Sequence, residues 1–288
     1  PFAAPSRLHI QVAERAARIP GNLYDSKCKK MAVADYLLRN FAKQLERYSF
    51  QAHGSGKSGI IQVTRCGQEV LERTACEIEE KTGNIIVRFE VGFPARGRTI
   101  QAGELIKILY QYLPACVEKA LYYKNMDQNA VKRAAELSVD QEYIREQLKK
   151  EGLIAFVADG SILPRESGVS QRPMKDAVPF VSPDSMKVTM KLPYKGVLTG
   201  MGIRKGITLV VGGGYHGKST LLKALESGVY PHIAGDGREY VVTDDTAMKI
   251  RAEDGRSIRH TDISMFINDL PNGKDTYAFD TEDASGST

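Results

Sequence analysis

The segment at residues 212–220, which reads GGGYHGKST, restricts the fold more than any other part of this 288-residue chain. It matches G-x-x-x-x-G-K-[ST], a spacing that lets the backbone curl until several N–H groups point at one anion. Such a loop leaves a buried strand and opens a helix, whose N-terminus also attracts phosphate. The apolar run ITLVV at 207–211 predicts that strand, and STLLKALES at 219–227 predicts the helix.

This loop predicts that the chain binds ATP or ADP with Mg²⁺. Lys218 is the expected catalytic residue because its charge reaches the outer phosphates, and the Ser219 hydroxyl is the expected Mg²⁺ ligand. Thr220 is expected to contact the α-phosphate, while His216 is either another phosphate contact or an unconstrained loop position. The predicted nucleotide-binding residues of the loop are Gly212, Gly213, Gly214, Tyr215, His216, Gly217, Lys218, Ser219 and Thr220.

A second Gly-Lys-Ser occurs in HGSGKSG, at residues 53–59, but it does not fit the pattern. Gln51 stands where the pattern requires its first Gly, and the segment that follows Ser58 reads GIIQV, which predicts a strand where a helix is needed. We expect a flexible, basic turn here that does not bind nucleotide. Its Lys57 can still contact the phosphate backbone of a nucleic acid.

The positive charge of the chain is concentrated near its N-terminus. Residues 1–60 hold ten Lys or Arg against four Asp or Glu, a net charge of +6, whereas the whole chain carries +5. This bias suits a polyanion such as a nucleic acid, although a solvated basic surface explains it equally well. The candidate nucleic-acid contacts are Lys27, Lys29, Lys30, Lys57, Arg96 and Arg98. Few aromatic residues lie among them, which argues against a platform for stacking single-stranded bases.

The composition restricts the compartment. None of the four cysteines forms a C-x-x-C pair, so a zinc finger is not expected, and we interpret the thiols as reduced and the protein as intracellular. No apolar run approaches the roughly 20 residues that cross a bilayer, so no membrane partner is expected.

Periodicity predicts an α/β fold with helices at 31–50, 101–113 and 127–150 and strands at 59–63, 69–80, 85–93 and from 153. Pro114 is expected to end or kink the second helix, and Gly152 to cap the third. The loop at 160–183 is long enough to be functional or disordered. A boundary near Glu151 would give a smaller basic accessory domain, 1–150, and a phosphate-binding domain, 151–288.

Several segments resemble the ATPases of the ABC class, and together they cover nearly the whole chain. They are PFAAPSR at the start, VGFPARGRTI, FVADGSILPRESGVSQRPM and GMGIRKGITLVVGGGYHGKSTLLKALESGVYPHIAGDGRE. Within this family the chain is similar to the ABC-fold ATPase associated with kinetoplastid mitochondrial RNA editing. That closer resemblance implies a mitochondrial location, whereas the family alone leaves a cytoplasmic one.

The resemblance implies a soluble ATPase in which two protomers enclose two nucleotides and act on a macromolecule, with RNA favoured. Ser285, Gly286 and Ser287 would then form the signature loop that faces the nucleotide of the partner protomer. The family's Asp-Glu pair follows that loop, so we expect it to lie beyond Thr288 and expect this chain alone to bind nucleotide without efficient hydrolysis. YVVTDD at 240–245 is similar to such a strand but precedes the loop, so we interpret it as a strand end with a helix cap.

Two other functions remain open from the residues alone. A kinase or phosphotransferase acting on a small molecule would need an arginine lid, for which the candidates are Arg238, Arg251, Arg256 and Arg259. A nucleotide-gated binding module would need no catalysis. Arg165 and Arg172 are candidate contacts to ribose or phosphate, and Tyr194 either stacks on adenine or packs in the core.

Overall fold

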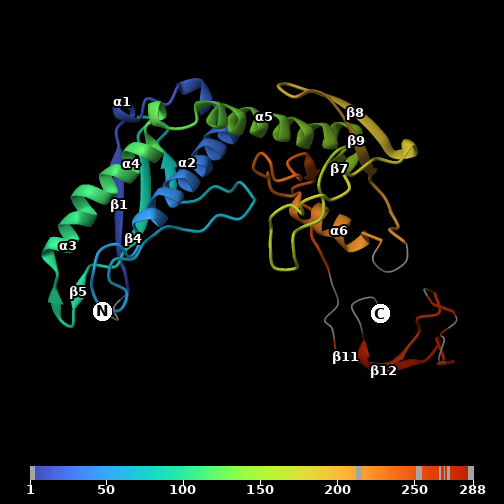
Figure 1. The fold of residues 1–288 in the computed structure, drawn as a ribbon. Coiled ribbons are helices and arrows are strands. Elements are labelled where there is room, and N and C mark those ends of the chain that lie inside the picture. The colour runs from blue at the N-terminus through green and yellow to red at the C-terminus, as the bar shows by residue number, and fades with distance from the viewer. Residues whose placement is uncertain are drawn as a thin grey trace. The chain divides into compact units, whose positions relative to one another are not determined.

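The structure is a computed structural model that describes residues 4–211, 216–250, 255–265, 267–268, 270 and 273–284, with 283 and 284 by backbone alone. It divides into two compact units, Pro1–Ala247 and Met248–Thr288. The first unit is a mixed α/β structure in which the described residues form two four-stranded sheets and a two-stranded hairpin (Figure 1). In the part of the chain described, no helix is both long enough and apolar enough to cross a bilayer.

The first sheet is antiparallel and is built around β4 (Ile85–Val91). Strand β1 (Ser6–Val12) pairs along one side of β4, with Ser6 opposite Val91. The short strands β2 (Ile61–Gln62) and β3 (Cys76–Ile78) also pair with β4. Alternate residues of β4 are buried, as expected for a sheet with one face against a core.

The strand predicted at 69–80 is mostly wrong, because only 76–78 pairs in the sheet. The preceding backbone bonds elsewhere: the Val70 N–H donates to Pro231 O at 2.7 Å. The Arg39 guanidinium also donates to the carbonyl oxygens of Gly67 and Glu69. These tertiary contacts use the backbone groups that a longer strand would need, so the alternating pattern does not extend the sheet.

Two helices, α2 (Lys27–Tyr48) and α4 (Leu113–Leu121), cover one face of this sheet (Figure 1). Helix α2 begins four residues before the predicted start, because the Ser26 side chain accepts from the N–H of Lys29 and caps the helix. The smaller helical elements of this half are α1 (Glu14–Ala17), η1 (Gly21–Leu23), α3 (Ala102–Lys107), η2 (Ile108–Tyr112) and η3 (Tyr123–Asn125).

Of the two alternatives predicted for Pro114, an end or a kink of the helix at 101–113, the end is wrong. The π-helical turn η2 joins α3 to α4, and Pro114 stands in the first turn of α4. A proline is tolerated at that position because the first N–H groups of an α-helix have no intrahelical acceptor. The helical path therefore continues to Leu121.

Helix α5 (Gln128–Glu151) is shared by two hydrophobic cores. Val131 and Ala135, near its start, belong to the first core with α2 and β4. Ile144 and Leu148, near its end, belong to a second core with β7 (Leu153–Ala158) and its neighbours. The bounds agree with the prediction: Asp127 caps the start by accepting from Ala130 N, and residue 152 is a left-handed glycine at the C-cap.

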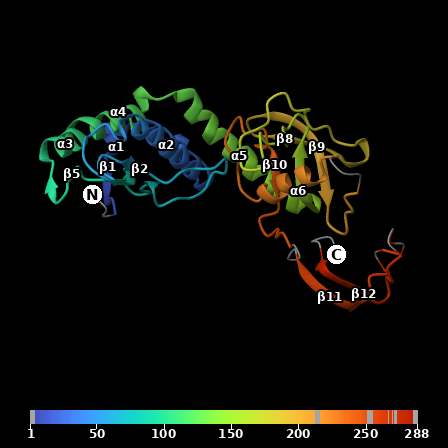
Figure 2. The same cartoon turned by 60° about the horizontal axis from the view of Figure 1, so that its bottom comes forward.

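The second sheet is antiparallel, in the order β10-β7-β9-β8. Its other strands are β8 (Lys187–Leu192), β9 (Gly196–Arg204) and β10 (Val241–Thr243), with η4 (Asp184–Met186) before β8. Phe156 packs in the core that includes α5, whereas Val157 packs in the core that includes helix α6 (Lys218–Ser227). Figure 2 shows these two helices with strands β8, β9 and β10. Successive residues of β7 therefore pack against helices on opposite faces of the sheet, α5 on one face and α6 on the other. Burial on both faces explains why the sequence of β7 is almost continuously apolar.

The strand predicted at 207–211 is absent, since β9 ends at Arg204. Ile207, Leu209 and Val211 are 103%, 80% and 73% exposed. A β-branched run forms a strand only where a neighbouring strand can take its N–H and C=O groups, and none of the described residues pairs with this segment. The helix predicted after the loop is present as α6.

In the described part of the second unit, β11 (Arg256–Thr261) and β12 (Phe279–Ala284) form an antiparallel pair. The Arg259 guanidinium donates to the Glu282 carboxylate across this pair. Ile263 is buried, and its N–H donates to Thr276 O at 2.8 Å. Strand pairing and these contacts link the described residues of this unit.

Replacing Leu148 with Ala should lower the free energy of unfolding by about 2–5 kcal/mol, because Leu148 is fully buried and truncation leaves a cavity. The control Glu142→Ala, at an exposed position of the same helix, should change that free energy by about 0.5 kcal/mol or less. Urea unfolding followed by circular dichroism measures both. Equal losses in the two variants would contradict the role of α5 in the second core.

Candidate nucleotide-binding site

Helix α6 begins where the sequence predicts the end of the phosphate-binding loop. Gly217 has a φ of 82°, in the left-handed region, and is the N-cap of the helix. None of the described side chains caps α6, so its first N–H groups point toward the loop without a side-chain acceptor. Lys218 and Thr220 are half-buried, whereas His216 and Ser219 are exposed. Gly212, Gly213, Gly214 and Tyr215 lie outside the described residues.

The C-terminal end of α6 is fixed to the second sheet. Ala224 is fully buried in the core that includes Val157 and Val241. The Thr243 hydroxyl donates to Leu225 O at 2.7 Å. The helix that follows the predicted loop therefore has a fixed support.

A buried ionic cluster lies beside the end of α6. Asp236 is 1% exposed, and its Oδ2 is 2.7 Å from both Arg165 Nη2 and His232 Nδ1. The Arg165 Nη1 also donates to Asp236 O at 2.8 Å. Because His232 Nε2 is 3.2 Å from Ser227 O, the cluster reaches the last residue of α6. Arg165, a candidate nucleotide contact, thus has a buried carboxylate partner inside the protein.

Arg238 is part of the same region and is not a lid residue. It is 6% exposed, and its Nε donates to Leu163 O at 3.0 Å. Its Nη1 donates to the Ser227 hydroxyl at 3.3 Å. Burial, with a smaller contribution from the charge of Arg165, lowers the pKa of Arg238 to about 10. A mobile lid needs an exposed arginine, so this position does not support the kinase alternative.

The other candidate residues are dispersed. Arg172 is exposed in the long loop, and Tyr194 is half-exposed at the β8–β9 turn rather than packed in a core. Arg256 and Arg259 belong to β11 of the second unit. The predicted residues Arg251, Ser285, Gly286 and Ser287 lie outside the described part of the chain.

The segment YVVTDD ends strand β10, as predicted, but it does not cap a helix. The Asp244 carboxylate accepts from the N–H and the hydroxyl of Thr246 and so forms a turn. These hydrogen bonds lower the pKa of Asp244. Within the residues described, no group of three or more His, Cys, Asp or Glu side chains is arranged to hold a metal ion. The Ser219 hydroxyl remains the predicted Mg²⁺ ligand.

The basic cluster at the start of α2 is largely neutralised by nearby carboxylates. The Lys29 ammonium is 2.9 Å from Asp25 Oδ1, and the hydrogen bond to Asp25 raises the pKa of Lys29. Lys30 pairs with Glu80, and this bond lowers the pKa of the Glu80 carboxyl. The adjacent pocket, which Lys27 lines, is also lined by Glu72, Glu77 and Glu79. These acidic neighbours oppose the approach of a polyanion.

The turn at 54–59 packs against the hairpin of β5 (Ala95–Arg96) and β6 (Thr99–Ile100). The Ser55 N–H donates to Ala95 O at 2.8 Å, and the Ala95 N–H donates to the Ser58 hydroxyl at 3.1 Å. Since the Ser58 hydroxyl is buried and bonded to the backbone, it is not available to a phosphate or Mg²⁺. A side chain at position 92 would meet Lys57 O at 1.9 Å, so only glycine permits this packing.

This packing forms what we call the hairpin surface, which consists of Lys57, Arg96, Arg98 and the exposed rings of Phe50 and Phe93. The Phe50 N–H donates to Gly59 O, which places the first ring beside the turn. For the three cations, no ion pair with a carboxylate is found among the described residues. The sequence has few aromatic residues among the candidate cations, which argued against base stacking. The exposure of Phe50 and Phe93 on this surface became apparent only in the structure.

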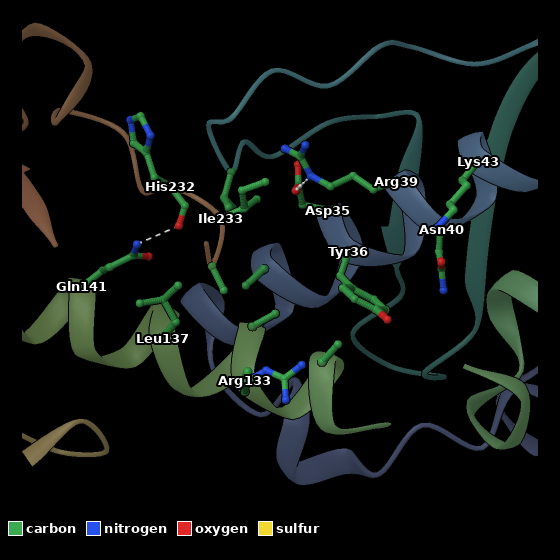
Figure 3. Close-up of a pocket in the computed structure, with 15 residues that line it drawn as sticks. Asp35, Tyr36, Arg39, Asn40, Lys43, Arg133, Leu137, Gln141, His232 and Ile233 are labelled. Atoms are coloured by element: carbon green, nitrogen blue, oxygen red, sulfur yellow. Dashed lines mark hydrogen bonds and ion pairs between the residues drawn. The ribbon is translucent and has the colours of Figure 1, made fainter. Parts of the chain in front are cut away.

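A pocket of about 330 Å³ lies between α2 and α5 (Figure 3). Its charged wall contains Asp35, which is buried and ion-paired with Arg39 and Arg73. On the opposite side, the Gln141 amide donates to His232 O at 2.8 Å, as Figure 3 shows. The pocket is thus lined both by α2 and α5 and by His232, whose Nε2 lies within hydrogen-bond distance of Ser227 O at the end of α6.

Comparison with known proteins gives two family matches and one curated relative. The family model ABC_ATPase, described as a P-loop domain, matches residues 127–288, and ABC_N, described as the N-terminal part of an ATPase of the ABC class, matches 1–124. An uncharacterised protein, MJ1628, of Methanocaldococcus jannaschii is 29% identical over 175 residues. That match covers 58% of this chain and 39% of the relative, so it spans well under half of the relative's length.

Replacing Asp236 with Asn should lower the free energy of unfolding by about 3–5 kcal/mol, because it leaves the buried Arg165 charge without its partner. Asp184→Asn is the control: Asp184 pairs with Lys187 at 2.8 Å, but on the surface. That variant should lose about 1 kcal/mol or less. Chemical denaturation measures both values, and similar losses would mean that the buried cluster does not stabilise the fold.

Proposed function

Because the chain belongs to the ATPases of the ABC class, we propose that residues 212–220 bind ATP or ADP with Mg²⁺. The observation that supports this most strongly is the start of α6, where Gly217 is left-handed and the first N–H groups have no side-chain cap among the described residues. Such a helix N-terminus attracts phosphate. In this proposal Lys218 neutralises the outer phosphates and Ser219 ligates Mg²⁺.

Hydrolysis and dimerisation are part of the proposal for the whole protein. Ser285, Gly286 and Ser287 would complete the nucleotide site of a second protomer, as the family resemblance implies. The match covers 39% of the curated relative, so hydrolysis and dimerisation are proposed for the whole protein and not for this chain alone. The mitochondrial location and the link to RNA editing stay predictions from the resemblance.

We further propose that the protein acts on a nucleic acid, with RNA favoured, and that the hairpin surface makes the contact. Its three cations have no carboxylate partners among the residues described, whereas Lys29 and Lys30 are paired with acids. Phosphate contacts need uncompensated positive charge, and exposed aromatic rings allow bases to stack. This argument favours Lys57, Arg96 and Arg98 over the cluster at the start of α2.

Lys218→Ala should weaken binding of a fluorescent ATP analogue with Mg²⁺ by about 10- to 100-fold, the effect of losing charge-assisted hydrogen bonds to phosphate. Lys57→Ala is the matched control, since it removes the same charge from the other Gly-Lys-Ser segment. It should leave the nucleotide affinity nearly unchanged. Comparable losses in both variants would remove the distinction between the two segments.

Replacing Lys57, Arg96 and Arg98 together by Glu should nearly abolish binding of mixed-sequence RNA. The matched triple change of Lys27, Lys29 and Lys30 to Glu should have a smaller effect. A filter-binding series over salt concentration measures both, and each phosphate contact should contribute roughly 0.7–0.9 to the log–log slope. A larger loss from the α2 triple variant would place the contact there, and salt-independent binding would exclude a phosphate-based contact.

A further inference from the structure

A polar pocket of about 410 Å³ lies along one side of α6 in the first unit. Thr220, Lys223 and Ser227 form the helix side of the pocket, at the spacing that places residues on one helix face. The long loop forms the opposite side through residues that include Arg165, Ser167 and Gln171, with Gln68 and Glu69 at the edge. The volume is in the range of small-molecule sites.

The chemistry of this pocket is set by Arg238, a buried cation without a carboxylate partner. Its hydrogen bonds go to Leu163 O and to the Ser227 hydroxyl, which are neutral acceptors. In the described part of the chain no carboxylate lies within ion-pair distance of its guanidinium. Asp236 pairs with Arg165 and His232 and acts on Arg238 only through its more distant charge. A buried charge is costly unless an opposite charge compensates it.

The guanidinium groups of Arg165 and Arg238 also retain hydrogen-bonding capacity. A guanidinium has five N–H donors, and Arg238 makes three hydrogen bonds, through Nε, Nη1 and Nη2. Arg165 makes two, both to Asp236. Both side chains line the pocket. Donors therefore remain for an acceptor that enters it.

The balance of charge favours an anion. Arg165, Lys223 and Arg238 line the pocket as cations, and Glu69 is the acidic residue among the lining groups. The three cations are opposed by the carboxylate of Glu69 and by that of Asp236, which pairs with Arg165. The sum of these charges is one positive charge. Serine, threonine and glutamine side chains supply further neutral donors. Guanidinium groups and hydroxyls are the usual partners of phosphate oxygens.

We propose that this pocket binds the phosphate group of a small phosphate monoester, at a site separate from the nucleotide phosphates of residues 212–220. Arg238 and Lys223 contact the phosphate oxygens, and the remaining volume holds the organic part of the ligand. The proposal does not depend on nucleotide binding, since it rests on the side of α6 and not on its N-terminus. Thr220 is the residue that the two sites have in common.

The test uses isothermal titration calorimetry of the full chain carrying Lys218→Ala, which disables the nucleotide loop. The probes are inorganic phosphate and ribose 5-phosphate. The Lys218→Ala protein should bind each probe with an affinity within about threefold of that of the protein that keeps Lys218. If ribose 5-phosphate binds more tightly than inorganic phosphate, the ligand is a phosphate monoester. If the two probes bind equally tightly, the pocket binds free phosphate and the organic part makes no contribution.

The variants that test the pocket are Arg238→Lys, which keeps the charge but loses the fork, and Arg238→Met, which loses both. Each should weaken phosphate binding by about tenfold or more. Since Arg238 is buried, the exposed Lys223→Glu provides a second test that does not threaten the fold. It should also weaken binding by about tenfold, whereas Lys191→Glu, an exposed position on β8 away from the pocket, should have no effect.

Two outcomes would overturn the proposal. Loss of all phosphate binding in the Lys218→Ala protein would place the phosphate in the nucleotide loop. Equal affinities for Lys223→Glu and Lys191→Glu would show that the pocket is not used. Neither result contradicts the proposed ATP site. If the unaltered protein bound phosphate but not ATP, the ATP site would be rejected and the pocket proposal would remain.

Discussion

The packing of α5 into two cores is the constraint on which the first unit depends. Val131 and Ala135 pack with α2 in one core, and Ile144 and Leu148 pack with β7 in the other. The same helix also bonds to the backbone after α6, through Gln141 to His232 O and Arg145 to Thr243 O. A helix of 24 residues therefore joins the basic half of the chain to the half that carries the predicted phosphate-binding loop.

The elements predicted correctly were those whose formation depends on nearby residues. Helices α2 and α5 have apolar periodicity, and the caps by Asp127 and the glycine at 152 are local. The predictions failed where distant partners decide. Strand 207–211 finds no partner among the described residues, and β1 forms because β4 supplies the neighbouring strand. The segment SRLHIQV alternates polar and apolar residues from Arg7 to Val12, which is a strand pattern that the sequence-based predictions missed.

For the candidate site, the phosphate-binding role of residues 212–220 stays a prediction from the sequence, of which the structure describes the helix that follows the loop. The sequence did not indicate the electrostatic surroundings of the other charges. Lys30 and Lys57 are equivalent in a count of charge, yet Lys30 pairs with Glu80, fifty positions away in the chain. Arg238 was a candidate lid residue of the kinase alternative, and the structure buries it with its Nε donating to Leu163 O. Only the tertiary structure brings these partners together, so composition could not have distinguished a neutralised cation from an available one.

The support at the C-terminal end of α6 has a mechanical consequence. Leu225 O, Ser227 O and Gly228 O all accept hydrogen bonds or lie within hydrogen-bond distance of Thr243 or His232. A sliding motion of α6 along its own axis would break these bonds together, whereas a tilt about Ser227 would preserve most of them. If the N-terminal end of α6 at Gly217 is displaced, we therefore expect the helix to rotate slightly about its C-terminal end, where these hydrogen bonds hold it.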